Sequence, residues 1–294
     1  GQTQSSGLEF TLHGTPVRSR NWEVTVGGNL TLLDNKVNSI SSSLPNLPIA
    51  QYGDNAGSYA VAGQAFPVIM GYDYLRDPEG HVIVDRTTGA PQKDPNIKIL
   101  GAAVPKHRLG LDGTVKFKNF QLSFLFEYRG GYKVYNSGGA TYDWAGVSYR
   151  TGVFDRNRFV FPNSVYEDPN KPGSYIKNTN ITVVDGNGNA GFWSDDDLNM
   201  SVTSNYVTSG DFWKLREVSL SYTVPASVVK RLKYVKGITA SVQGRNLFVW
   251  LSKYNYYTDP EYSDSGNDSN GIGLTGLSQT PPSRFMGATL SVTF

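Results

Sequence analysis

One short segment rich in side-chain oxygens has a spacing that could bind a divalent cation. Asp185, Asn187, Asn189 and Asp196 occupy positions 1, 3, 5 and 12 of a loop that imitates a calcium-binding loop. Carboxylate and amide oxygens are the ligands that calcium prefers. However, position 6 is Ala190 instead of glycine, the last donor is aspartate instead of glutamate, and no flanking helices are predicted. The alternative interpretation is an Asx-rich turn at a loop tip.

Aromatic clusters in two long segments between strands are the candidates for substrate binding. One contains Tyr142, Trp144 and Trp193, and the other contains Tyr254, Tyr256, Tyr257, Asp259 and Glu261. Flat rings can stack on sugar faces or peptide side chains, while carboxylates accept hydrogen bonds from hydroxyls or amines. Alternatively, these rings fold the loops onto themselves or onto a partner protein, or belong to an interfacial aromatic belt.

No arrangement of residues is typical of an enzyme. The histidines His13, His81 and His107 each lack a second ligand at metal-binding spacing, and the carboxylates Asp195 to Asp197 are adjacent in one loop. There is no Gly-x-Ser-x-Gly elbow, no cysteine, and no phosphate loop with its lysine. We therefore predict a protein that is not an enzyme and that uses no cofactor, apart from the calcium ion considered above.

The elements that must position these loops are β-strands. Apolar and polar residues alternate with a period of two, which predicts strands whose faces meet different environments. The polar faces carry Glu, Asp, Lys and Arg, as a wet lumen requires, and the apolar faces are rich in aromatic residues, as lipid contact favours. The alternating segments are 8–12, 22–32, 109–117, 120–128, 218–224, 238–250 and 286–294, with weaker candidates at 66–76 and 82–87.

The composition agrees with a barrel and excludes other classes of protein. No stretch approaches the roughly 20 apolar residues of a membrane-spanning helix, whereas barrel strands keep the average hydropathy low. The 27 basic and 25 acidic residues are too balanced for a nucleic-acid-binding surface. The sequence begins Gly-Gln-Thr-Gln without an initiator methionine or a signal peptide, so we expect a mature fragment of a longer protein.

The connections between these segments alternate in length. Long connections at 38–65, 88–104, 132–210 and 252–283 alternate with short ones at 15–20, 77–80, 118–119 and 225–236. Outer-membrane barrels have long extracellular loops and short periplasmic turns. Nine strands would fit this alternation, and the terminal strand ending on Phe294 is typical of barrel closure. We predict an all-β fold: a segment of an antiparallel transmembrane β-barrel, with long extracellular loops and short periplasmic turns.

Several motifs resemble the SusC/RagA family of TonB-dependent outer-membrane transporters. The segment Ser209 to Pro225 resembles the family's penultimate-hairpin signature, although Trp213-Lys214 replaces the usual aliphatic residue and arginine. Gly244 to Trp250 resembles its Asn-Leu-Phe motif, and Asp259-Pro-Glu261 its Asp-Pro-Glu loop start. The resemblance spans about 7 to 294, with upstream matches at 7–10, 100–105 and 118–123.

The resemblance, unlike the periodicity, implies a transport function. It implies that residues 1–294 are the C-terminal part of a plugged barrel of about 22 strands, of which they supply the last eight or nine. The plug and the segment that contacts TonB do not occur in this sequence. The implied partners are the remaining N-terminal barrel and plug, TonB, a SusD-like surface lipoprotein and the lipid bilayer, and the implied location is the outer membrane of a Gram-negative bacterium.

Three functions are compatible with these observations. The first is import of a nutrient, either an oligosaccharide or a peptide, by a SusC/SusD-like transporter. The second is glycan binding by a soluble β-sandwich, because half-buried soluble sheets also alternate. The third is a barrel that acts as a scaffold for other surface proteins without transporting a solute.

Overall fold

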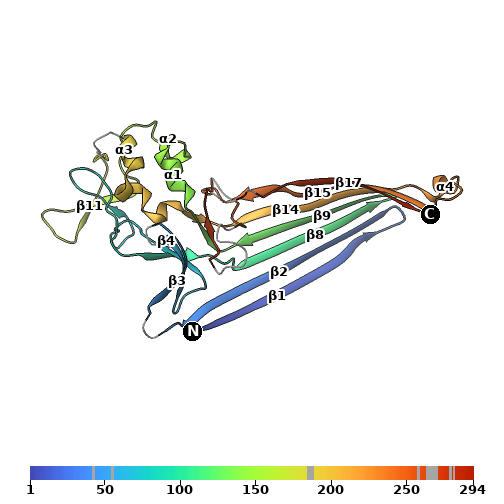
Figure 1. Cartoon of the computed structure of the whole chain (residues 1–294), viewed down its shortest axis with the longest axis horizontal. Coiled ribbons are helices and arrows are strands. Elements are labelled where there is room, and N and C mark those ends of the chain that lie inside the picture. Colours follow the sequence, from blue (N-terminus) through green and yellow to red (C-terminus); the bar gives the residue numbers. More distant parts are fainter. Residues whose placement is uncertain are drawn as a thin grey trace.

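The computed structural model describes residues 1–41, 44–53, 56–183, 189–256, 259–262, 271–277, 280 and 282–294. Long antiparallel strands form one twisted sheet of seven members, in the order β1-β2-β8-β9-β14-β15-β17 (Figure 1). Neighbours in this series pair with one another, and in the described residues β1 and β17 are the two edges. The strands are β1 (Gln2–Arg18), β2 (Trp22–Ser39), β8 (His107–Phe117), β9 (Phe120–Gly130), β14 (Phe212–Thr223), β15 (Gly237–Leu251) and β17 (Phe285–Thr293).

The register of this sheet sorts the side chains into rows of one chemistry. One row of directly paired residues crosses six strands and is apolar throughout: Val24, Val115, Leu122, Leu220, Val242 and Ala288. The next row is polar or small: Thr25, Thr114, Ser123, Ser219, Gln243 and Gly287. Because successive residues of a strand point to opposite faces, one face of the sheet is apolar and the other is polar. The alternation predicted from the sequence is confirmed.

The apolar face is exposed. Leu122, Leu220 and Val242 retain 39%, 44% and 55% of their accessible surface, and Leu290 retains 68%. Three smaller sheets and most of the helices lie together at one end of the long strands (Figure 1), so none of these described elements covers this face. A contiguous exposed apolar surface of this size marks contact with lipid or another protein.

The connections sort by length, as predicted, but two segments interpreted as strands are not part of the main sheet. Short connections join β1 to β2, β8 to β9 and β14 to β15, the last containing α4 (Ala226–Val229), and they lie at one end (Figure 1). Residues 40–106, 131–211 and 252–284 connect the strands at the opposite end. The prediction that 77–80 is a turn at the short-turn end was wrong, because it lies within the long 40–106 connection.

Residues 66–76 and 82–87 do not join the main sheet because their short strands pair within a compact assembly formed by the long connections. Residues 66–76 contain β5 (Val68–Gly71), in which all four residues are buried, and 82–87 contain β6 (Val82–Ile83). β6 pairs in parallel with β11 (Ser164–Glu167), which belongs to a different long connection. The main sheet therefore has seven strands in the described residues, instead of the eight or nine predicted.

The loop assembly contains the buried core of the chain. Its first sheet contains β3 (Asn46–Tyr52), β4 (Ala56–Val61), β5 and β7 (Lys98–Ala102). Its second sheet contains β12 (Tyr175–Lys177), β11 and β6. Its third sheet contains β13 (Val207–Ser209), β10 (Lys133–Asn136) and β16 (Leu274–Thr275). Within the described parts of these connections, five helical segments complete it: α1 (Gly138–Trp144), α2 (Tyr149–Gly152), α3 (Asn189–Ser194), the π-helix η1 (Asp196–Met200) and the 3-10 helix η2 (Thr203–Tyr206). Ile69, Tyr135 and Leu274, one from each long connection, share one apolar cluster, which fixes the three connections together.

Candidate functional site

A β-bulge in β14 positions the charged residues at the loop end of the sheet. Leu215 pairs with Phe126 of β9 and Glu217 pairs with Leu125, so Arg216 is the extra residue of the bulge. An extra residue shifts the alternation by one. In a strand without a bulge, residues 214, 216 and 218 would all lie on one face. Because the bulge shifts the alternation after Arg216, Lys214 and Arg216 lie on the polar face while Val218 lies on the apolar face.

These two cations bind the Asp-Pro-Glu motif of the last loop. The Lys214 Nζ lies 2.6 Å from Asp259 Oδ2 and also contacts Glu261, and the Arg216 guanidinium donates two hydrogen bonds to Glu261, one of them 2.7 Å long. Arg129 of β9 lies 3.0 Å from the same carboxylate. Lys214 is 3% exposed and Glu261 is 14% exposed. The two carboxylates that we predicted to bind substrate thus join the last loop to the wall of the sheet.

The protonation of Glu261 reflects this environment. Burial acts to raise the pKa of its carboxyl group, but hydrogen bonds from Arg216 and Lys214, together with their positive charges, outweigh burial and lower the pKa to about 2. Glu261 is therefore ionised throughout the physiological range. Its charge is balanced by the protein and is not free to bind a solute.

A pocket of about 670 Å³ lies in the loop assembly and brings two of the predicted aromatic residues together. Tyr254 and Tyr256 line it from the last loop, and Tyr149 lines it from α2. The rings of Tyr149 and Tyr256 lie 5.1 Å apart at their centres and are tilted by 34°. The remaining lining residues are Lys133, Asp143, Arg150, Val153, Asn205, Tyr206, Val207, Thr208, Ser209, Ser252, Lys253 and Asn255.

Asp143 and Arg150 form the polar floor of this pocket. The Asp143 carboxylate, 1% exposed, accepts hydrogen bonds from Ser148, from Arg150 at 2.9 Å, from Asn199 at 3.1 Å and from Tyr206 at 3.0 Å. Burial raises the pKa of the Tyr206 phenol, so this group keeps the proton that it donates. Asp143 is fully satisfied, whereas Arg150 keeps an exposed portion.

Arg150 is also held by aromatic rings. Its guanidinium lies 5.3 Å from the centre of the Trp193 ring and 5.4 Å from that of Tyr206, distances at which a cation is attracted to an aromatic face. Its Nη2 also donates to Asn199 at 3.3 Å. The guanidinium is thus pre-oriented at the pocket wall.

The other predicted aromatic residues do not line this pocket. Tyr142 is half-buried in α1, and Trp144 at the end of the same helix is 63% exposed. Trp193 is buried against Phe159 and Phe192 and therefore contributes to the core of the loop assembly. Tyr257 lies outside the described residues.

Sequence reasoning missed the charged half of the pocket. Lys253 directly precedes the predicted tyrosines, and Asp143 lies between two predicted aromatic residues. Both could therefore have been proposed as pocket residues from their positions in the sequence. Nothing in the sequence indicated that Lys133, Tyr149 and Arg150 line the pocket, because their positions depend on how the 131–211 connection folds.

The predicted calcium loop falls mostly outside the described residues. Asp185 and Asn187 lie outside them, and Asn189 begins α3, where only the backbone is described. Asp196 is exposed in η1, next to Asp195, which caps that helix by accepting a hydrogen bond from the Leu198 N–H. Asp196 is thus an exposed residue of a capped helix, and the calcium site stays a prediction.

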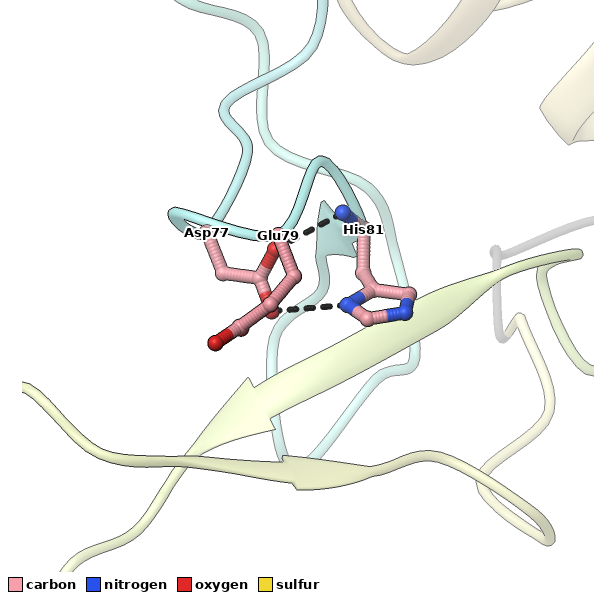
Figure 2. Close-up of side chains that lie close together, drawn as sticks. All are labelled: Asp77, Glu79 and His81. Atoms are coloured by element: carbon pink, nitrogen blue, oxygen red, sulfur yellow. Dashed lines mark hydrogen bonds and ion pairs between the residues drawn. The ribbon is translucent and has the colours of Figure 1, made fainter.

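A different group brings metal-binding residue types together (Figure 2). Asp77, Glu79 and His81 each offer one ligand atom, and these atoms lie within 4.8 Å of one another. However, both Asp77 oxygens are already occupied, one by the His81 backbone N–H at 2.7 Å and the other by His81 Nδ1 at 2.8 Å. Burial opposes ionisation of Asp77, but these hydrogen bonds outweigh it and lower its pKa. The arrangement is that of a turn stabilised by side chains.

We expect His81→Ala to loosen this turn by about 1 kcal/mol, the usual effect of losing one partly exposed hydrogen bond. Amide hydrogen exchange of residues 77–84 in the intact receptor would measure it, and Arg86→Ala, an exposed change in the next turn, should leave the exchange unchanged. An equal effect of the two changes, or an exchange rate in the unmodified protein that depends on added zinc, would contradict the interpretation as a turn.

No helix among the described residues is long and apolar enough to cross a membrane.

Comparisons with known proteins agree with the geometry. No family model matches the sequence. Two curated relatives from Formosa agariphila are TonB-dependent receptor P26, 26% identical over 295 residues and 93% of this chain, and TonB-dependent receptor P39, 20% identical over 91% of it. The chain spans only 27% and 28% of the length of these relatives.

Solved structures show the same fold. The RagAB peptide transporter matches 99% of this chain with a TM-score of 0.61 at 14% identity, and the RagAB peptide importer in the "open-open" state matches with a TM-score of 0.62. The chain covers 29% of each matched chain. The predicted resemblance to TonB-dependent receptors is confirmed in sequence by these relatives, and the chain shares the fold of the part of the RagAB transporter that it matches.

Proposed function

We propose that the chain is the C-terminal part of an outer-membrane barrel that imports a nutrient by a TonB-dependent mechanism. The observation that carries this proposal is the relationship, over nearly the whole chain, to TonB-dependent receptors. The energy would come from TonB acting on a plug encoded elsewhere in the full protein. A SusD-like lipoprotein would cover the loop end, where the pocket lies. The solute is an oligosaccharide or a peptide.

The exposed apolar face favours a barrel over the alternative of a soluble sandwich. A β-sandwich buries the apolar face of one sheet against a second sheet at about 10 Å. In the described residues, the smaller sheets lie beyond the ends of the long strands and leave Leu122, Leu220 and Leu290 exposed. Lipid contact accounts for such a face, because hydrocarbon tolerates apolar side chains and a fully paired backbone.

Uptake by cells tests the proposal and separates import from a scaffold role. The full-length receptor would be deleted from its host and restored either intact or without its plug, and growth on candidate oligosaccharides and peptides would be measured. Import predicts that the intact gene restores growth on at least one solute and that the plugless form loses energy-dependent uptake. Normal growth of the deletion strain on every candidate, with loss of other surface proteins, would support the scaffold.

The orientation of the sheet provides an independent prediction. These 294 residues contain no cysteine, so single cysteines introduced into them can report accessibility, with the receptor lacking the introduced cysteine as the background. With the long connections outside the cell, a membrane-impermeant maleimide should label Asn157→Cys and Glu79→Cys on intact cells. Lys233→Cys, in the connection that contains α4, should react only after the outer membrane is permeabilised. Labelling of Lys233→Cys alone on intact cells would reverse the orientation.

A further inference from the structure

The pocket lined by Tyr149, Tyr254 and Tyr256 carries an excess of positive charge. Lys133, Arg150 and Lys253 line it, against the single carboxylate of Asp143. Asp143 already accepts hydrogen bonds from four groups, so its charge is neutralised within the wall. Both lysines are exposed, and among the described residues neither takes part in an ion pair. Arg150 balances Asp143, so the uncompensated charges at the pocket are those of Lys133 and Lys253.

The same pocket is bordered by the edge of a sheet. Val207, Thr208 and Ser209 form β13, which pairs with β10 on one side and has no partner on the other within the described residues. Gly210 donates its N–H to Tyr132 of the neighbouring chain segment. Because backbone groups alternate along an antiparallel ladder, Thr208 also faces β10, and the backbones of Val207 and Ser209 point away from it. Val207 already donates its N–H to the Ser204 carbonyl, so Ser209 supplies the N–H donor of this edge.

An unpartnered strand edge and free cations recognise a specific kind of molecule. An edge supplies backbone donors and acceptors to an extended peptide that adds as a further strand. Lysine and arginine supply the charge partners for carboxylates on that peptide, and exposed tyrosine rings cover its apolar portions. A neutral sugar would leave the charges without partners.

We propose that this pocket binds an extended acidic peptide, which adds to the β13 edge while its carboxylates contact Lys133, Arg150 and Lys253. This inference rests on the proposed function, since it names the class of solute that the importer would take. Strand addition fixes the orientation of the peptide main chain, and the cations select for its charge. Binding is therefore expected to weaken as ionic strength rises.

Binding to the purified full-length receptor in detergent tests the inference separately from transport. The probes are a fluorescein-labelled hexapeptide of alternating alanine and aspartate, the same peptide with asparagine for aspartate, and an oligogalacturonate of equal charge, measured by fluorescence anisotropy or by competition. We expect the aspartate peptide to bind at least tenfold more tightly than either other probe. Equal binding of the asparagine peptide would overturn the role of charge, and preference for the oligogalacturonate would overturn the peptide.

Two variants connect the binding to the named residues. Lys133→Gln combined with Lys253→Gln should weaken binding of the aspartate peptide about tenfold, because two exposed charge contacts are lost. Lys171→Gln, an exposed lysine between β11 and β12, is the control and should have no effect. Ser209→Pro should weaken binding of all peptides without disrupting β10 pairing, because it removes an N–H that points away from β10.

The outcomes remain distinguishable from failure of the proposed function. A receptor that binds the aspartate peptide as expected but supports no uptake would retain this inference and overturn import. A receptor that imports a solute while none of these variants alters peptide binding would retain import and overturn the inference. Near-native mobility of each variant in unheated gels would show that it has folded.

Discussion

Replacement of Glu261 by glutamine is expected to release the last loop from the barrel wall. The change keeps the shape of the side chain but removes the charge that Lys214 and Arg216 share. Breaking a buried ion pair by removing one partner costs about 3–5 kcal/mol. We expect the low end of this range, because Lys214 keeps Asp259 and Arg216 keeps Glu127 as charge partners. Hydrogen exchange or limited proteolysis of residues 252–262 in the full-length receptor would measure this local loss of stability.

Glu217 provides a matched control for this experiment. It lies one residue beyond Arg216 in the same strand and pairs with Arg245 at 3.3 Å, but both side chains are largely exposed, at 42% and 59%. Glu217→Gln should therefore change stability by about 0–1 kcal/mol, as is usual for surface pairs. If both substitutions altered the loop equally, the network at Glu261 would not be its anchor.

The same carboxylate predicts how the loop responds to acid. A group whose pKa is lower in the folded state stabilises that state above its unfolded pKa and loses this effect as the pH falls through the folded value. For Glu261, the ordinary value is 4.5 and the folded value is about 2. Its contribution, about 3 kcal/mol by linkage, is complete above pH 5 and disappears toward pH 2. The loop should stay attached at pH 5, and Glu261→Gln should abolish the pH dependence in this window.

The long strands were predictable because one physical pattern repeats along them. A strand between two different environments must alternate, and each of the seven strands of the main sheet carried that pattern. The bulge at Arg216 could not be found in the same way, because it interrupts the period that identifies a strand. The motif Lys214-Leu-Arg216 and the motif Asp259-Pro-Glu261 were each recognised in the sequence, but their direct contact follows only from the fold.

The loop assembly was predicted less well because its strands are short and pair with distant parts of the sequence. β6 has two residues and pairs in parallel with β11 more than 80 positions away, so no local periodicity indicates it. Aromatic residues in loops were equally ambiguous. Tyr254 and Tyr256 line the pocket, whereas Trp193, of the same chemical class, is buried beside Phe159. Residue type indicates that a ring is buried or binds something, and only the fold decides which.

The assignment of one face of the sheet to lipid and the other to the lumen predicts that arginine destabilises the two faces unequally. Val218 and Ser219 are neighbours near the middle of β14, and Val218 pairs with Phe124 on the apolar face while Ser219 pairs with Ser123 on the polar face. In a barrel, arginine on the lipid side near the bilayer centre costs about 2–4 kcal/mol, and arginine in the lumen costs far less. We therefore expect Val218→Arg to destabilise the full-length receptor in lipid vesicles, and Ser219→Arg to be much milder.

The comparison is sharp because the two substitutions introduce the same side chain into the same strand, one residue apart. Both variants gain the same charge, and the loss of valine's strand propensity accounts for about 1 kcal/mol at most, so an effect of about 2–4 kcal/mol reports mainly on the face. Urea unfolding in vesicles gives the free energies, and a repeat in mild detergent should reduce the cost of Val218→Arg, because a micelle adapts to a charge more readily than a bilayer does. Equal costs for the two variants would mean that neither face meets lipid, and the exposed apolar rows through Leu122 and Leu220 would then require a protein partner instead.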